Sequence, residues 1–213
     1  QSVCKQEASV FKNIRQFVVL TVVAGVICCA QAESFSVKGS IFEAAGRENN
    51  IDPVLLYSIA LVESAVVAPG KKGYLNPFPW TLRTDKPFYG ASKTEAEAEL
   101  NRLIKTNRSV DVGLMQINTR WHGHRVDRIT DLLDPLTNVR VAAQILNEQF
   151  DRYSDDAERA VGSYHSSDPE RSRWYARHVL RVYTELQKQA AHSKTVNQTG
   201  DSGRHQRALM QLH

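Results

Sequence analysis

The chain has 213 residues, of which 42% are hydrophobic and 23% charged, and its formal net charge is +4 at pH 7. These values fit a globular protein with a core of ordinary size. A charge this small, without a basic helix or a motif of stacked aromatic side chains, argues against a nucleic-acid-binding protein.

An apolar run near the start of the chain, residues 16–30, predicts a secretory signal peptide. Lys12 and Arg15 precede the run, and Ala32 supplies a small side chain of the kind that a signal peptidase reads. The run holds about fourteen apolar residues, and because a membrane-spanning helix needs about 20, we favour a cleaved signal over an anchor. We therefore expect residues 1–32 to be the signal segment that is removed on export, with Val10 as an alternative translation start and the residues before it as extra upstream sequence.

All three cysteines, Cys4, Cys28 and Cys29, lie in this expected signal segment. The mature protein is therefore expected to contain no disulfide, no thiol chemistry and no cysteine-bound metal. The sequence also lacks the EF-hand, Rossmann, P-loop and zinc-protease patterns. We expect neither a metal nor an organic cofactor, so the stability of the fold has to come from a packed apolar core.

The mature part, residues 33–191, reads as a mainly α-helical single globular domain. Apolar side chains recur on a helical period, and several helices are opened by an Asp-Pro pair. The helices are expected at residues 37–50, 51–64, 94–107, 136–153, 155–164 and from Pro169 on. Thr94 and Glu97 have the spacing of a capping box. Beyond these helices, residues 192–213 are polar and are expected to form a disordered tail.

Residues from about 66 to 109 interrupt the helical pattern and predict a loop-rich insertion. The segment is dense in Pro, Gly and aromatic residues, and a short hairpin is expected around residues 80–82. We expect most of its aromatic side chains to form a small satellite core under the loops. Trp80 and Trp121 are the aromatic residues that we select as candidates for contact with a ligand.

Glu63 is the most informative residue, because it stands where an apolar side chain is expected. Asp52 can cap its helix and Pro53 suits the first helical position. Leu56 and Ile59 lie on one face of this helix, and Glu63 continues the same stripe without a Lys or Arg nearby in the sequence. A carboxylate on an apolar face is costly to ionise. We therefore expect Glu63 to keep a proton near neutral pH and to act as a general acid.

Three short blocks follow one another along the chain: Glu63-Ser64, Gly113-Leu114-Met115-Gln116-Ile117-Asn118 and Ala160-Val161-Gly162-Ser163-Tyr164-His165. Together they resemble the catalytic domain of the soluble-type lytic transglycosylases, which is similar to goose-type lysozyme. The Glu-Ser pair, the Gly-Leu-Met-Gln block and the Ala-x-x-x-Tyr block carry the resemblance, which covers roughly residues 38–188. One block alone is weak evidence, whereas all three in order behind a secretion signal are strong evidence.

The resemblance implies a lysozyme-like fold and a lytic transglycosylase, a carbon–oxygen lyase that acts on peptidoglycan. Such enzymes cleave the β-1,4 bond between N-acetylmuramic acid and N-acetylglucosamine without water and leave a 1,6-anhydromuramyl end. Carried over by position, Glu63 protonates the leaving glycosidic oxygen. It then takes the proton of the sugar's own 6-hydroxyl, which attacks the anomeric carbon. One carboxylate serves both steps, so the second carboxylate of most glycosidases is not required.

The resemblance also assigns substrate contacts, and each has a structural alternative. Ser64 and Gln116 are expected near the acid, although Ser64 also ends a helix and a buried Gln116 needs partners of its own. Gly113 either lets the backbone approach a sugar closely or is simply needed for a turn. Asn118 is a weaker candidate for a contact in the sugar-binding groove. Tyr164 is expected to orient the acid or, alternatively, to lie in the core.

Two departures from the family pattern bear on the assignment. His165 stands where the family often has Asn, and we expect it to keep a polar contact with the substrate. The gap between Ser64 and Gly113 is longer than in common members, and it resembles the version found in enzymes that accompany conjugation, type IV secretion and pilus systems. The resemblance thus implies peptidoglycan strands as substrate, components of such a machine as partners and a periplasmic location, with contact to a membrane only during export.

Two other functions stay open at this point. A lysozyme-like hydrolase of the same bond would need a second group to position water, and Asp111 is the nearby candidate, although it could instead cap a turn. A catalytically silent peptidoglycan-binding assembly protein is the other alternative. An intact Glu63 argues against it, because a silent domain has no need of an acid on an apolar stripe.

Overall fold

The computed structural model describes residues 35–67 and 74–210, with side chains up to residue 191. This part of the chain holds seven α-helices, two short 3₁₀ helices and six short strands, so the predicted, mainly helical fold class is confirmed. The expected signal segment and its three cysteines lie outside the described residues. Within the described ranges, no helix is long and apolar enough to cross a membrane.

Two capped helices open the domain, α2 (Ile41–Asn49) and α3 (Pro53–Ser64). The Ser40 hydroxyl caps α2 by accepting a hydrogen bond from the Glu43 amide, which is why the helix begins later than predicted. Asp52 caps α3 by accepting a hydrogen bond from the Val54 amide, and Pro53 occupies the first turn, both as predicted.

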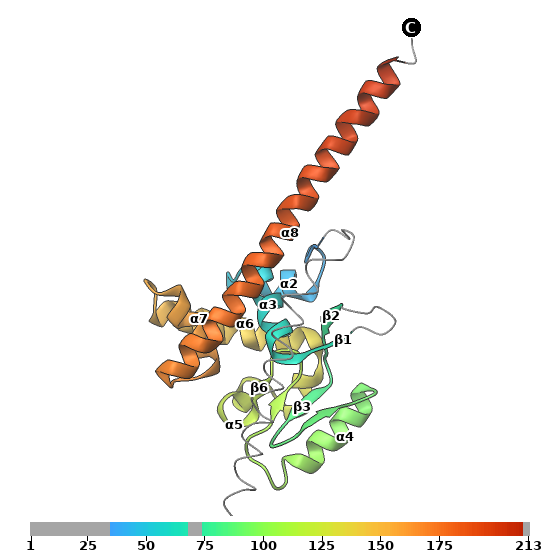
Figure 1. Ribbon diagram of the computed structural model, residues 1–213. Coiled ribbons are helices and arrows are strands. Elements are labelled where there is room, and N and C mark those ends of the chain that lie inside the picture. Colours follow the sequence, from blue (N-terminus) through green and yellow to red (C-terminus); the bar gives the residue numbers. More distant parts are fainter. Residues whose placement is uncertain (1–34, 68–73, 211–213) are drawn as a thin grey trace, which may run out of the picture.

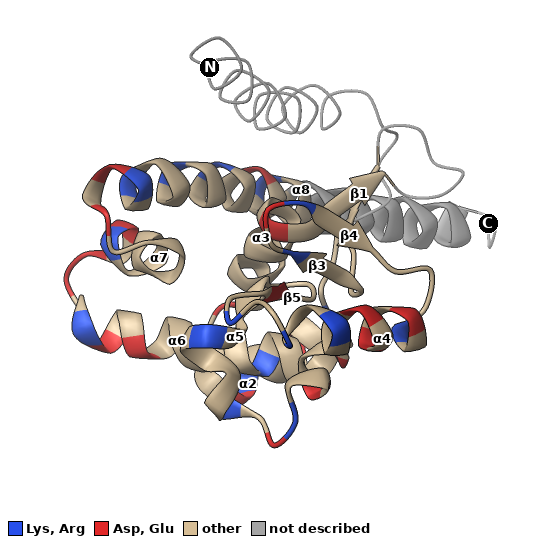
Figure 2. Ribbon diagram, turned by 90° about the horizontal axis from the view of Figure 1, so that it is seen from below, with Lys and Arg blue, Asp and Glu red and all other residues tan. Residues whose placement is uncertain are grey.

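Three further helices complete the helical part (Figure 1), namely α6 (Pro135–Arg152), α7 (Ala157–His165) and α8 (Pro169–Met210). α6 packs against α2, α7 packs against α6 and α8, and α8 runs alongside α3. Side chains of Asp134 and Asp156 cap α6 and α7. Charged positions of both signs are spread over α4, α6, α7 and α8 (Figure 2), as expected for helices with one face in solvent.

The predicted insertion folds into two small antiparallel sheets and a helix. Its elements are β1 (Ala65–Val67), β2 (Leu75–Pro77), β3 (Thr81–Arg83), β4 (Pro87–Tyr89) and α4 (Lys93–Leu103). β5 (Asp111–Val112), β6 (Ile117–Asn118), α5 (Thr119–His122), η1 (Gly123–Arg125) and η2 (Ile129–Leu133) follow. β1 pairs with β2, and the larger sheet has the order β4-β3-β5-β6. β3 therefore joins the insertion to the second sequence block through β5.

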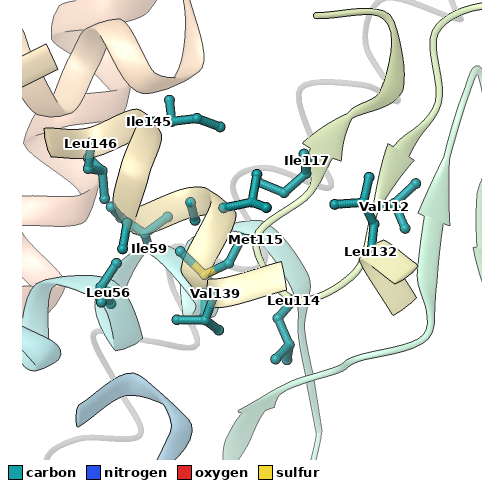
Figure 3. Packing of buried hydrophobic residues seen from close by; sticks show 14 of the residues in the cluster. Leu56, Ile59, Val112, Leu114, Met115, Ile117, Leu132, Val139, Ile145 and Leu146 are labelled. Atoms are coloured by element: carbon teal, nitrogen blue, oxygen red, sulfur yellow. The ribbon is translucent and has the colours of Figure 1, made fainter. Parts of the chain in front are cut away.

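One core serves the whole domain. Side chains of α3 and α6 converge with Met115 and its neighbours in Figure 3. Leu82 of β3 and Leu100 of α4 belong to the same buried cluster, and Trp80 and Phe88 pack against it. The prediction of a separate satellite core is therefore wrong. The reason is the β3–β5 pairing, which draws the insertion onto the body of the domain.

The N-terminus of α4 differs from the prediction by two residues. Ser92, not Thr94, caps the helix by accepting a hydrogen bond from the Glu95 amide, and Glu95 reaches back to the Ala91 amide. Glu97 instead lies 3.8 Å from Lys93 in an exposed ion pair. Both serine and threonine can cap, so the sequence alone does not select the register.

The C-terminal segment also differs from the prediction. α8 continues as a helix to Met210, through most of residues 192–213, which the sequence analysis expects to be disordered. Residues 192–210 contain no proline, and Lys, Gln, Arg and Ala among them are good helix formers that can extend a helix already nucleated by packing.

Replacing Gly162 by Ala is expected to destabilise the fold by about 1–3 kcal/mol, because α7 and α8 touch at this glycine. An added Cβ would lie 2.3 Å from Ser172 Oγ and 2.5 Å from the Ser172 carbonyl oxygen. Urea unfolding of Gly162→Ala measures the loss, and Glu158→Ala on the exposed side of α7 is the control. Equal stability of the two variants would show that the helices do not meet in this way.

Candidate active site

Glu63 lies in the last turn of α3 with 8% of its surface exposed. Leu56 and Ile59 on the same helix face are fully buried, which confirms the apolar stripe. Among the described residues, His165 is the one basic group within 4 Å of the carboxylate, and its Nδ1 lies 3.8 Å from Glu63 Oε1. The Glu63 side chain is therefore largely shielded from water and is held in no arginine pair among these residues.

Aromatic side chains from α7 and α8 wall this carboxylate. The rings of Tyr175 and His165 stack with centroids 4.5 Å apart, and the rings of Tyr175 and Tyr164 stack with centroids 6.4 Å apart. Burial, followed by the Glu63 carboxylate, raises the pKa of Tyr164 and of Tyr175 well above the usual value. Both phenols are therefore neutral at physiological pH and close to Glu63.

Tyr175 was not selected by the sequence analysis, which treats it as one apolar residue of the last helix. Its hydroxyl is buried and makes no hydrogen bond of normal geometry among the described residues, although it lies close enough to the Glu63 carboxylate for that group to raise its pKa. A buried phenol without a partner, close to a carboxylate, is a group that a bound ligand can satisfy. In the sequence, Tyr175 occupies an apolar position of a helix, as any core residue does, so nothing in the sequence marks it as a functional residue.

The structure places His165 beside the acid, whereas its expected contact with the substrate stays a prediction. The ring is 43% exposed in its side chain and stacks on Tyr175. The interaction with Glu63 raises the pKa of His165 above 6.5, against the lowering effects of burial and of Arg83. At 3.8 Å the contact is an electrostatic one, too long for a hydrogen bond.

A second carboxylate, Asp111 of β5, lies in the same electrostatic environment. Burial raises the pKa of Asp111, the hydrogen bond from Asn118 lowers it, and the Glu63 charge raises it again. Asn118 Nδ2 donates to Asp111 Oδ1 at 2.7 Å and to Ser109 Oγ at 2.9 Å. Asp111 thus pairs across the sheet rather than capping a turn, and Asn118 orients it.

The Gly113–Asn118 block is a tight turn clamped by one side chain. Asn138 of α6 is fully buried, accepts a hydrogen bond from the Met115 amide and donates to the Val112 and Leu132 carbonyls. Gly113 has φ 80°, and a Cβ there would lie 2.5 Å from Asn138 Nδ2. The glycine is therefore required by the turn and by the Asn138 clamp, which is the structural alternative named for it above.

Gln116 sits in this turn with an unusual backbone. Its φ of 48° is in the left-handed region, which costs free energy for a residue other than glycine. Nε2 donates to the Thr81 and Gly113 carbonyls, while Oε1 is buried without a partner among the described residues. The strained backbone and the unsatisfied side-chain oxygen are stronger evidence that Gln116 contacts a ligand than its position in the sequence block is.

Two predicted contacts have their hydroxyl groups occupied within the protein. Ser64 Oγ donates to the Leu114 carbonyl at 2.8 Å and accepts a hydrogen bond from the Phe78 amide. The Tyr164 hydroxyl donates to the Met115 carbonyl at 2.8 Å. Both residues therefore tie the turn to α3 and α7, and the structure favours a positioning role for them over direct contact with a substrate.

An open pocket of about 450 Å³ adjoins the acid. It lies between the end of β3, the loop that follows α4, and α5; its lining residues are Arg83, Thr84, Asp85, Thr106, Asn107, Arg108, Ser109, Asp111 and Arg120. Arg83 Nη2 donates to the Glu63 carbonyl oxygen at 3.2 Å, so the pocket begins next to the end of α3. Of the two tryptophans selected as candidates for ligand contact, Trp121 directly follows the lining residue Arg120 in the sequence and is 63% exposed. Trp80 packs edge-on against Phe78.

The described residues contain no group of three or more His, Cys, Asp and Glu side chains that could hold a metal ion. The groups gathered at the site are carboxylates, an imidazole, two phenols and an amide. These groups suit proton transfer to and from an oxygen atom of a bound ligand.

Comparison with known proteins identifies a family to which most of this chain is similar. A family model described as "Transglycosylase SLT domain" matches residues 40–179, which include all the site residues described above. No curated protein matches the chain.

Replacing Asn138 by Ala is expected to destabilise the fold by about 3 kcal/mol or more, because three buried backbone groups lose their partner. Thermal or urea unfolding measures the effect, with Gln144→Ala on the exposed face of α6 as control. Should Asn138→Ala unfold at the same urea concentration as the control, the clamp is not what holds the turn.

The raised pKa of His165 makes a pH-dependent contribution to stability. A group with a folded-state pKa above its unfolded value stabilises the fold at low pH, and the effect is lost as pH rises through the folded-state pKa. Wild type should therefore exceed His165→Gln in stability at about pH 5.5, and the difference should fade by about pH 8.5. Because the imidazole is half-exposed, the expected effect is below about 1 kcal/mol.

Urea titrations at both pH values measure this difference. His124→Gln, which removes an exposed imidazole from η1, serves as control. A stability difference for His165→Gln that grows with pH would contradict the assigned sign.

Proposed function

The chain belongs to the SLT transglycosylase family, whose model matches 40–179 of its 213 residues, and from this premise we propose the reaction and its residues. A lytic transglycosylase-type activity on peptidoglycan follows from the family. We propose that the protein cleaves the β-1,4 bond between N-acetylmuramic acid and N-acetylglucosamine and forms a 1,6-anhydromuramyl end. The observation that carries the proposal is the nearly buried Glu63 carboxyl group, walled by Tyr164, Tyr175 and His165.

The first step needs a proton on Glu63. Glu63 lies in the last turn of α3 and is largely shielded from water, where it can meet the glycosidic oxygen of a bound strand. The protonated acid donates to the glycosidic oxygen while the bond from this oxygen to the anomeric carbon breaks. The leaving sugar departs as an alcohol, and Glu63 is left as a carboxylate.

The second step returns the proton. The 6-hydroxyl oxygen of the muramyl residue forms a bond with the anomeric carbon, and its proton passes to Glu63. No water is consumed and Glu63 ends in its starting state. A shielded carboxyl group suits this cycle, because bulk water is kept from competing with the sugar hydroxyl.

The remaining groups position the acid and the sugar. The unsatisfied Gln116 Oε1 and the Tyr175 hydroxyl are available to a sugar hydroxyl or acetamido group. His165 lies 3.8 Å from Glu63 and stabilises the carboxylate that forms after the first proton transfer. Ser64 and Tyr164 hold the turn that carries Gln116.

A hydrolase that cleaves the same bond is the second candidate, and Asp111 favours it. This carboxylate lies near enough to Glu63 for the two charges to interact, and Asn118 holds it in place. A carboxylate so placed could orient a water molecule for attack on the anomeric carbon. We retain the transglycosylase as the first candidate because the family as a whole, rather than one residue, supports it.

Periplasmic location and a role in opening the wall for a conjugation, secretion or pilus machine are parts of the same proposal. The long segment between the first two blocks supports them by resemblance. It folds as part of the domain, with β3 paired to β5 beside the acid, so it can shape which region of the wall polymer is bound. A silent binding protein is less favoured, since Glu63 is intact and shielded.

Glu63→Gln is expected to lower activity by at least about a thousandfold, because the amide cannot donate and recover the proton. Purified mature protein is incubated with peptidoglycan, and mass spectrometry identifies the muropeptides. Anhydromuramyl ends are the predicted product, and reducing ends would select the hydrolase instead.

Glu158→Gln on the surface is the matched control. A fully active Glu63→Gln protein would overturn both candidates, and an inactive wild type that still binds the wall would point to the silent binding protein.

A further inference from the structure

The open pocket beside Glu63 is more basic than the rest of the site. Three arginines line it, Arg83, Arg108 and Arg120, against two acidic residues, Asp85 and Asp111. Of the two acids, Asp111 already accepts a hydrogen bond from Asn118 within the protein. The lining therefore favours an anion.

The three guanidinium groups are available to a ligand. Among the described residues, none of the three lies within 4 Å of a carboxylate, as is also true of several surface arginines on α6, α7 and α8, but these three are gathered in one pocket. Arg108 and Arg120 are exposed at the rim, and Arg120 is held over the ring of Trp121 at 4.9 Å. Clustered arginines without internal carboxylate partners are arranged for recognition rather than for stability.

The position of the pocket, next to the end of α3, indicates which part of a bound glycan strand could supply the anion. Arg83 donates to the carbonyl of Glu63, and Asp111, its cross-strand neighbour, interacts electrostatically with the Glu63 side chain. An anion in this pocket therefore lies on the side of the site where α3 ends and β3 meets β5. The glycan backbone of peptidoglycan carries its negative charge on the stem peptide, which leaves the lactyl group of each muramyl residue and bears free carboxylates.

We propose that this pocket, formed by Arg83, Arg108 and Arg120, is a subsite for a carboxylate of the stem peptide on the muramyl residue next to the cleaved bond. A volume of about 450 Å³ is large enough for a short peptide segment. Guanidinium groups bind carboxylates through paired hydrogen bonds. This inference rests on the proposed function, since it assumes that the glycan strand lies across Glu63, and it makes the enzyme selective for strands that still carry peptides.

The test compares three substrates: glycan strands with stem peptides, strands whose peptides an amidase has removed so that each muramyl residue keeps only its lactyl carboxylate, and strands whose peptide carboxylates are amidated. For wild type we expect a KM about tenfold lower on the peptide-bearing strands than on the other two. For the double variant Arg108→Gln/Arg120→Gln we expect this ratio to fall to about one, through a higher KM on peptide-bearing strands with kcat little changed. Arg83 is left intact because it also binds the Glu63 carbonyl.

The control is Arg47→Gln/Arg171→Gln, which removes the same net charge from exposed positions outside the pocket. A tenfold ratio in this control together with its loss in the pocket variant supports the inference. The inference is overturned by a wild type that does not discriminate among the substrates, by a ratio that persists in the pocket variant, or by equal loss in the control. Equal preference for amidated peptides would also overturn it, because charge would then play no part.

A binding experiment separates this inference from the proposed function. The Glu63→Gln protein is titrated with the disaccharide tripeptide GlcNAc–MurNAc–tripeptide and with the peptide-free disaccharide, and binding is followed by calorimetry. Tighter binding of the peptide-bearing disaccharide, lost in the Arg108→Gln/Arg120→Gln background, supports the subsite even if wild type proves inactive on every substrate. Activity without any such binding difference would leave the proposed function standing and remove the subsite.

Discussion

The buried amide of Asn138 is the contact on which the arrangement of the site depends. It satisfies one backbone donor and two backbone acceptors of the segments around Gly113, and so fixes a turn that would otherwise bury unpaired polar groups. The turn is linked to α3 through Ser64 and to α7 through Tyr164. Residues from three distant sequence blocks thereby meet around Glu63, and the strain at Gln116 is held in place by these bonds.

Around that scaffold the Glu63 carboxyl group has neighbours of both signs. Asp111 is a second carboxylate close enough to interact with it, and the half-exposed His165 lies 3.8 Å from it. The imidazole can stabilise the carboxylate that forms when the acid gives up its proton. The unpaired arginines lie at one side of this centre and can hold an anionic substituent away from the acid itself.

The sequence predicts the helical class and the aspartate caps because apolar periodicity and capping are local signals, whereas the convergence of the three blocks follows from the family resemblance. It also predicts that Glu63 faces the core. It does not predict that β3 pairs with β5 and places Arg83 and Asp111 beside the acid, since strand pairing is non-local. Tyr175 and Asn138 were missed for different reasons. A buried tyrosine resembles any core residue, whereas Asn138 lies on the buried stripe with Val141 and Ala142 and could have been found by the argument that found Glu63.

The central claim is that Glu63 faces the bond of a glycan strand that is to be cleaved. A crystal structure of the Glu63→Gln protein with a bound GlcNAc–MurNAc oligomer tests it most directly. The account predicts the side-chain amide of residue 63 at about 3 Å from the glycosidic oxygen that follows a muramyl residue. A glycan bound elsewhere on the domain, with residue 63 still enclosed by Tyr175 and His165, would contradict it.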